Sequence, residues 1–207
     1  MTTTKTALIA GASGLVGGHC LNLLLQSNRY EKVIALLRKP LPVQHPKLEQ
    51  RLLDFDKIPE LAATLAADDV FCCLGTTMKQ AGSKENFYKV DYTYVAELAK
   101  ATYQKPGTQF LVVSAMGADK NSLFYYNRVK GEMEETVSNL PFAAVHIFRP
   151  SLLLGNRSET RAGEKIGEKV MESLKFALVG PLKKYRAIEA RTVARAMVTK
   201  AAGNTNG

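Results

Sequence analysis

The sequence predicts an α/β fold with a doubly wound parallel sheet, in a single domain with a short C-terminal extension. Three observations lead to this prediction. Apolar strand-like segments alternate with helix-like segments, the strands are apolar throughout rather than at every second position, and a glycine-rich turn follows the first strand. Strands of this kind are typical of a parallel sheet that helices cover on both faces. At 207 residues the chain is too short for two domains of ordinary size.

Hydrophobic spacing and turn residues define the elements in order. We expect strands over residues 7–10, 33–37, 49–53, 70–74, 110–114 and 143–148. We expect helices over residues 15–25, 58–67, 87–103, 123–137, 162–176 and 192–201, with a polar loop at 79–86 and a Gly180-Pro181 turn. Right-handed crossovers then give the strand order 3-2-1-4-5-6 of the Rossmann arrangement.

The turn after the first strand reads Gly11-Ala12-Ser13-Gly14-Leu15-Val16-Gly17. A turn of this kind directs backbone N–H groups and the positive end of a helix dipole at one point, which suits a pyrophosphate. Gly11 lets the chain turn sharply, Gly14 lets a phosphate approach, and Gly17 lets the helix lie close to the sheet. The spacing is G-x-x-G-x-x-G rather than G-x-G-x-x-G, so a tight turn that binds nothing is the alternative.

The second strand ends at Arg38-Lys39. At this place in a dinucleotide site an acidic residue binds the ribose 2′-hydroxyl, whereas an arginine accommodates a 2′-phosphate. Arg38 therefore predicts NADP(H) in preference to NAD(H). The alternative is a solvated basic residue at the end of a strand.

Ligands of such sheets bind beyond the carboxyl ends of the strands. We expect Asp54 to accept a hydrogen bond from the adenine amino group, with the backbone of Phe55 beside it. The Leu74-Gly75-Thr76 turn should lie against the middle of the cofactor. Ser114 ends the fifth strand and Arg149-Pro150 follows the sixth, so these residues should face the same crevice.

Tyr126 and Lys130 lie four residues apart on a predicted helix and therefore share one face. Hydride transfer to a carbonyl requires a proton for the developing alkoxide. An adjacent ammonium favours the tyrosine phenolate and makes proton exchange easier. Lys130 can also bind the nicotinamide ribose, and Ser114 can donate to the carbonyl oxygen. The alternative is a partly exposed Tyr–Lys pair, with Ser114 merely ending a strand.

Hydropathy, net charge and cysteine content exclude several classes of function. No apolar run approaches the roughly 18 residues that span a bilayer, so we expect no membrane insertion and a cytoplasmic protein. The formal charge of +9 invites a nucleic-acid interpretation, but the chain has no specific nucleic-acid motif. Cys20, Cys72 and Cys73 form neither a disulfide framework nor a metal site. The adjacent Cys72 and Cys73 should point to opposite faces of their strand.

Together the motifs resemble the extended or atypical short-chain dehydrogenase/reductase superfamily. The resemblance spans about residues 5–200 and is carried by residues 11–17, 38, 74–77, 90–91, 114–118, 126–130 and 148–150. The strings Cys-Cys-Leu-Gly-Thr-Thr, Val-Ser-Ala-Met-Gly-Ala-Asp-Lys and Val-Lys-Gly-Glu are similar to its small Tat-interacting-protein-type oxidoreductase branch. The resemblance implies an NADP(H)-binding domain with a Ser114, Tyr126 and Lys130 triad.

Two departures from the superfamily pattern affect the expected function. Asp91 stands where many extended members carry an Asn that is a candidate for holding a proton-relay water. The region after Arg149 is short, which disfavours a sugar-nucleotide epimerase or dehydratase. We expect a single domain over residues 1–207, with about 150–207 completing a small substrate-side cap.

The expected function is an NADP(H)-dependent oxidoreductase acting on a small carbonyl or alcohol that the sequence does not name. The alternative is a non-catalytic NADP(H)-binding regulatory or scaffold protein with a protein partner. We expect no metal, and a monomer or homodimer.

Overall fold

The computed structural model describes residues 4–103, 106–155 and 186–203. Its main sheet is parallel and has the order β3-β2-β1-β4-β5-β6. The strands are β1 (Lys5–Ala10), β2 (Tyr30–Leu37), β3 (Leu48–Leu52), β4 (Asp69–Cys72), β5 (Gln109–Val113) and β6 (Ala144–Phe148). The doubly wound sheet and its predicted strand order are confirmed.

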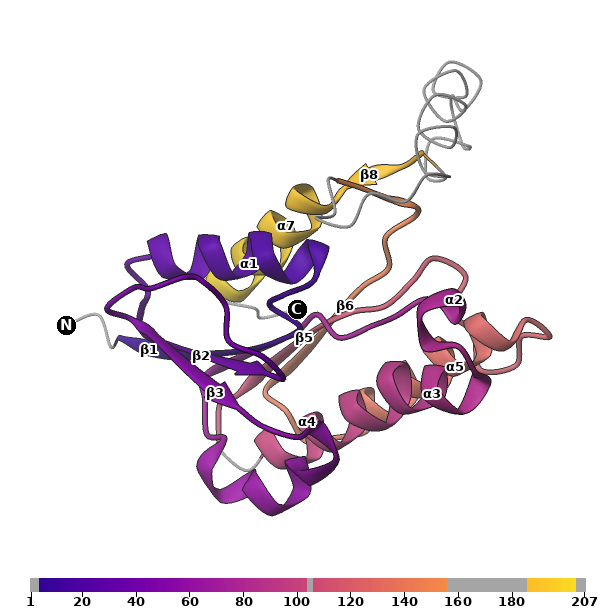
Figure 1. The fold of residues 1–207 in the computed structure, drawn as a ribbon, viewed down its shortest axis with the longest axis horizontal. Helices are drawn as coiled ribbons and strands as arrows, with labels where there is room; N and C mark the ends of the chain where they lie inside the picture. Colours follow the sequence, from indigo (N-terminus) through magenta and orange to yellow (C-terminus); the bar gives the residue numbers. More distant parts are fainter. Residues whose placement is uncertain (1–3, 104–105, 156–185, 204–207) are drawn as a thin grey trace.

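Helices cover both faces of this sheet (Figure 1). Helices α1 (Leu15–Gln26) and α7 (Ala190–Ala202) pack on one face, where Ile9 of β1 is buried. The helices η1 (Phe55–Thr64), α4 (Tyr94–Thr102) and α5 (Tyr125–Ser138) pack on the other face, where Leu8 is buried. Cys72 belongs to the second layer and Cys73 packs against the first, so the prediction that they point apart is confirmed.

Three local predictions differ from the structure. The segment predicted as a polar loop at 79–86 contains α2 (Met78–Ala81) and α3 (Lys84–Tyr88), whose N-terminal N–H groups are capped by the hydroxyls of Thr77 and Ser83. The helix predicted over 58–67 is the 3₁₀ helix η1. It contains Pro59, which has no N–H to donate. The helix predicted over 87–103 is divided by a π-helical turn, η2 (Lys89–Thr93), between α3 and α4.

The C-terminal part differs in smaller ways. Helix α5 begins at Tyr125 rather than at residue 123. A two-stranded parallel sheet that the sequence did not predict pairs β7 (Leu153–Leu154) with β8 (Ile188–Glu189). The helix predicted over 162–176 and the Gly180-Pro181 turn lie outside the described residues, as does most of the predicted cap.

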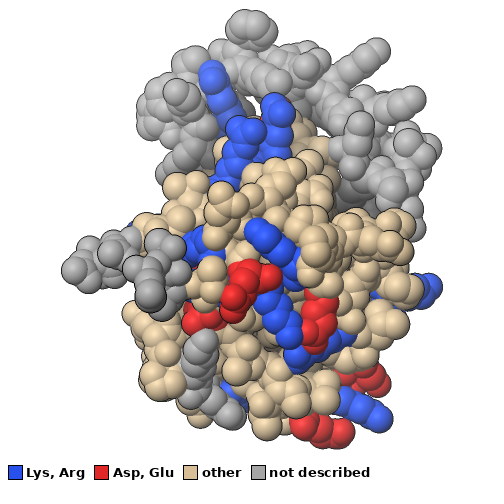
Figure 2. All heavy atoms as spheres, turned by 90° about the vertical axis from the view of Figure 1, so that its left-hand side faces the viewer, with Lys and Arg blue, Asp and Glu red and all other residues tan. Residues whose placement is uncertain are grey.

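The end of the sheet where the strands begin is tied together by one buried carboxylate. Asp69 is fully buried and accepts hydrogen bonds from the Tyr30 hydroxyl at 2.8 Å, the Gln109 side-chain amide at 3.0 Å and the Lys5 ammonium at 3.2 Å. Basic and acidic side chains also lie next to one another in the middle of the face shown in Figure 2. Part of the positive charge is therefore paired within the protein.

Candidate cofactor and catalytic site

The glycine-rich turn has the backbone geometry that its sequence predicts. Gly11 has a φ of +84°, and a Cβ there would lie 2.4 Å from the carbonyl oxygen of Cys73. A Cβ on Gly17 would lie 2.1 Å from the carbonyl oxygen of Gly11. The turn closes with a 2.9 Å hydrogen bond from the Gly14 N–H to the Gly11 oxygen. The sharp turn at Gly11 and the close approach of α1 at Gly17 are both present.

The N-terminus of α1 is open to an anion. Its N-cap is Gly14, which provides no capping side chain, and its first turn contains no acidic residue. Among the described residues, no side chain caps the N–H groups of Leu15 and Val16 or compensates the helix dipole there. Ser13 beside them is exposed. This arrangement fits the pyrophosphate of a dinucleotide.

The residues predicted to contact the adenosine follow β2 and β3, at the carboxyl end of the sheet. Arg38 directly follows β2, is exposed, and makes no hydrogen bond or ion pair with other residues that the structure describes. Asp54 follows β3, is exposed, and accepts a 3.1 Å hydrogen bond from the Asp56 N–H, which begins η1. Phe55 is buried in the layer with α4. Arg38 and Asp54 thus remain accessible to a ligand.

A buried ion pair connects the loop after β4 to α5. The Lys130 ammonium lies 2.7 Å from Oδ1 of Asp91, and the two side chains are only 4% and 1% exposed. The contact is an ion pair rather than a well-aligned hydrogen bond. The other carboxylate oxygen accepts a 2.8 Å hydrogen bond from the Thr76 N–H. A Cβ on Gly75 would lie 3.3 Å from the same Asp91 Oδ1, so the predicted turn contacts this pair directly. Leu74 packs against the α4 and α5 layer.

Ser114 directly follows β5 and is held by its backbone. Its N–H donates to the Phe148 oxygen at 2.8 Å, whereas its buried hydroxyl has no hydrogen-bond partner among the described residues. A buried hydroxyl without a partner is costly, so it is expected to serve a ligand or water that enters the site.

Tyr126 lies on the first turn of α5 and is 38% exposed, with its ring centroid 5.4 Å from that of Phe87. Burial raises the pKa of the Tyr126 phenol above its ordinary value; the Lys130 ammonium lowers this pKa, and the Asp91 carboxylate raises it. Lys130 therefore acts in the predicted direction, but the net effect is a phenol that stays protonated. Burial, the largest of these effects, depends on tertiary packing and could not be predicted from the spacing of Tyr126 and Lys130.

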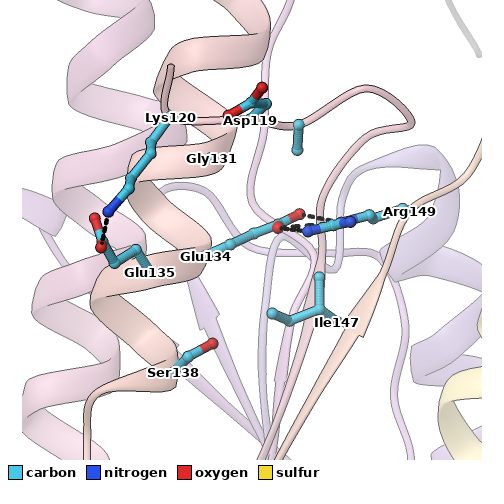
Figure 3. A pocket seen from close by; sticks show the side chains of 9 residues that line it. Asp119, Lys120, Gly131, Glu134, Glu135, Ser138, Ile147 and Arg149 are labelled. Atoms are coloured by element: carbon cyan, nitrogen blue, oxygen red, sulfur yellow. Dashed lines mark hydrogen bonds and ion pairs between the residues drawn. The ribbon is translucent and has the colours of Figure 1, made fainter. Parts of the chain in front are cut away.

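Arg149 is engaged on the other side of α5. Its Nε donates to Oε1 of the buried Glu134 at 2.9 Å, and the two side chains point toward one another and line a cavity of about 350 Å³ (Figure 3). The Pro150 oxygen accepts a 2.9 Å hydrogen bond from the Met116 N–H. Arg149 and Pro150 thus hold α5 and the loop after β5 in place, and a direct contact between Arg149 and the cofactor remains a prediction.

Gly131 is a residue of the site region that the sequence analysis did not single out. A Cβ there would lie 2.1 Å from the Lys120 nitrogen, so the loop after Ser114 can pack closely on α5 only because residue 131 is glycine. Gly131 is the glycine of the Val-Lys-Gly-Glu string, so the sequence already contained a pattern that could have pointed to it.

The fold and the open glycine turn define an NAD(P)-binding Rossmann protein, and comparison with known proteins agrees. The NAD(P)H-binding family matches residues 11–200, so the chain belongs to this family. Protein HTATIP2 of Rattus norvegicus is 39% identical over 201 residues, which cover 94% of this chain and 80% of the relative. This similarity confirms the superfamily and the branch that the sequence resembles.

Other comparisons extend the likeness. Protein fmp52, mitochondrial, of Aspergillus clavatus is 34% identical and covers 94% of this chain and 85% of the relative. The enzyme WbmH of Bordetella bronchiseptica, solved in complex with NAD⁺, superposes with a TM-score of 0.73 at 16% identity, covering 97% of this chain and 73% of WbmH. A short-chain dehydrogenase family protein of Francisella tularensis superposes with a TM-score of 0.64 at 13% identity, covering 95% of this chain and 90% of that protein. These structures support the fold.

Proposed function

We propose that the protein is an NADP(H)-dependent oxidoreductase that transfers a hydride to or from a small carbonyl or alcohol. The buried Ser114 hydroxyl, which has no hydrogen-bond partner among the described residues, carries this proposal. Ser114 follows β5 at the carboxyl end of the sheet, the same end at which the glycine turn follows β1. The Tyr126 and Lys130 pair on the adjoining helix α5 adds the acid and its charged neighbour.

The open N-terminus of α1 would hold the cofactor pyrophosphate, and Lys130 would hold the nicotinamide ribose. When bound, the reduced nicotinamide supplies the hydride. The Ser114 hydroxyl donates a hydrogen bond to the carbonyl oxygen and orients it. The Tyr126 phenol gives its proton to the oxygen that becomes the alcohol, and the Lys130 ammonium stabilises the phenolate that remains.

The decisive variant is Tyr126→Phe, which removes the proton donor and keeps the ring. NADPH consumption should be measured with a panel of small aldehydes, ketones and enones, and NADPH binding by thermal shift. We expect turnover to fall by at least the ~100-fold typical of a lost general acid while NADPH binding is unchanged. Undiminished turnover in Tyr126→Phe would refute the assigned role.

The preference for NADP(H) rests on Arg38, whose guanidinium has no partner among the described residues. Loss of a charged hydrogen-bond partner costs about 1–3 kcal/mol, so Arg38→Ala should weaken NADPH binding by roughly 10–100-fold and leave NADH binding nearly unchanged. The neighbouring exposed Lys39 provides the matched control, Lys39→Ala. Equal losses for both cofactors in Arg38→Ala would remove the preference.

A non-catalytic NADP(H)-binding role is the second candidate. Leu123 and Phe124, just before α5, are 96% and 74% exposed, and such apolar side chains suit a protein partner. Turnover above background for any substrate on the panel, lost in Tyr126→Phe, would decide against this candidate.

We also propose a cytoplasmic location. No described helix is long and apolar enough to cross a membrane. The fungal relative fmp52 carries the word mitochondrial in its name, so recovery with mitochondrial markers on cell fractionation is the result that would overturn this proposal.

A further inference from the structure

The Asp91 carboxylate joins two parts of the candidate site. One oxygen is 2.7 Å from the Lys130 ammonium of α5, and the other accepts a hydrogen bond from the Thr76 N–H in the loop after β4. Asp91 and Lys130 are 1% and 3% exposed as whole residues, so water screens this pair very little. The carboxylate therefore both holds Lys130 in place and offsets part of its charge.

The π-helical turn η2 places Asp91 at this position. It interrupts the run of helix between α3 and α4, and Asp91 is its buried member. Single π turns of this type are frequent at functional sites, because the extra residue directs a side chain where a regular helix would not. Within the part of the chain that the structure describes, Cys72 on β4 and Tyr126 on α5 are the titrating groups whose electrostatics involve this pair.

We propose that Asp91 is a positioning residue that anchors the Lys130 ammonium to the loop after β4 and opposes the effect of the Lys130 charge on the Tyr126 phenol. This inference rests on the proposed function and deepens it. A neutral phenol is the form that donates a proton, so the resting site is set for carbonyl reduction. The reverse reaction, alcohol oxidation, needs the phenolate and therefore requires a higher pH.

The electrostatics of the neighbouring groups agree with this assignment. Burial is the main effect that raises the pKa of the Tyr126 phenol; the Lys130 ammonium lowers this pKa, and the Asp91 carboxylate raises it and so opposes Lys130. Burial raises the pKa of the Cys72 thiol to about 12, so this thiol is uncharged near neutral pH and does not compete with Asp91 for the ammonium. Among the groups on the facing elements, the Asp91 carboxylate is thus the anion that balances Lys130.

The test is a pH titration of the Tyr126 phenol by its phenolate absorbance. Subtracting the Tyr126→Phe spectrum from that of the otherwise identical protein isolates this single phenol. In Asp91→Asn the Thr76 N–H can still donate to the amide oxygen, but the negative charge is gone. We expect the Tyr126 midpoint to move to lower pH, with a several-fold larger phenolate fraction at mildly alkaline pH.

Asp56→Asn is the matched control. Asp56 forms an ion pair with Lys89, which lies in the same π-helical turn, but the Asp56–Lys89 pair is exposed. The substitution removes the same charge without touching the buried pair, so the Tyr126 midpoint should stay where it is. An unmoved midpoint in folded Asp91→Asn, or an equal shift in Asp56→Asn, overturns the proposal.

A second pair of variants covers the possibility that Asp91→Asn leaves Lys130 buried without a partner and prevents folding. Lys130→Gln should be compared with the Asp91→Asn/Lys130→Gln double variant, which contains no buried charge at the pair. The Tyr126 midpoint should be lower in the double variant than in Lys130→Gln. Equal midpoints would overturn the proposal.

These titrations are independent of the proposed function because they require no substrate. If the midpoint shifts but no carbonyl compound is reduced, the reductase assignment fails and the charge-balancing role of Asp91 remains. If reduction is found, the alkaline limb of its pH profile should move with the phenol in Asp91→Asn. A uniform loss of rate at every pH with an unmoved limb would indicate a merely structural Asp91.

Discussion

The contact between α1 and the glycine-rich turn gives a sharp prediction for stability. Gly17 and Gly18 are adjacent on α1, but a Cβ would meet very different surroundings at the two positions. At Gly17 it would lie 2.1 Å from the oxygen and 2.7 Å from the carbonyl carbon of Gly11, both backbone atoms of the turn. At Gly18 the nearest atom would be the Ala12 oxygen at 3.5 Å, an ordinary van der Waals distance. Gly18→Ala is therefore a matched control for Gly17→Ala.

The expected magnitudes follow from two opposing effects. Replacing glycine by alanine inside a helix stabilises it by up to about 1 kcal/mol. Overpacking costs about 1–3 kcal/mol, and a clash with backbone atoms lies at the upper end because no side chain can rotate away. Gly17→Ala should therefore lower the free energy of unfolding by about 2 kcal/mol, whereas Gly18→Ala should raise it by roughly 0.5–1 kcal/mol.

Urea unfolding followed by circular dichroism measures both free energies. Thermal shift with NADPH adds a functional readout, because Gly17→Ala must also displace the turn on which the pyrophosphate is proposed to lie. Gly18→Ala should keep full NADPH binding. A Gly17→Ala protein as stable as Gly18→Ala would show that α1 can move away at little cost, and the argument for close packing at Gly17 would be wrong.

Two further predictions concern buried groups. Burial raises the pKa of the Cys72 thiol to about 12, above the ~8.5 of an unfolded thiol. The thiol therefore contributes its full stabilisation below about pH 8, and this contribution is lost as the pH rises toward 12. Between about pH 8 and 10.5 the urea midpoint should fall less steeply in Cys72→Ala than in the unchanged protein. Arg149→Gln leaves the buried Glu134 carboxylate without the guanidinium that pairs with it. It should therefore lower the urea midpoint more than Lys120→Gln, which breaks the exposed ion pair with Glu135. An equal loss in the two variants would show that the Glu134 pair contributes no more than the exposed pair.

The sheet could be predicted because most of its strands carry their own signal. Apolar runs such as Val33–Leu37 and Phe110–Val113 are continuous, and Gly or Pro residues separate most of them from the helices. The right-handed crossover rule then leaves few possible strand orders. The roles of Gly11 and Gly17 could also be predicted from the sequence, because they depend on local geometry within one strand, one turn and one helix.

The elements that were missed depend on forces that short windows of sequence do not show. The segment at 79–86 is polar, yet Thr77 and Ser83 cap two short helices within it. The ladder of β7 and β8 is two residues long on each side, too short for any alternating pattern. Pro59 was visible in the sequence, but the apolar spacing alone did not distinguish a 3₁₀ helix from an α-helix over this segment.

The site shows the same division between local and tertiary information. Tyr126 and Lys130 could be paired from their spacing because both lie on one helix, and the direction in which Lys130 acts on the phenol was predicted correctly. Asp91 comes from a different helical segment and reaches Lys130 only because a π-helical turn directs it inward. The protonation state of the phenol is therefore a tertiary property. It depends first on how the phenol is buried and then on the charges of both Lys130 and Asp91, and no motif that contains only Tyr126 and Lys130 carries that information.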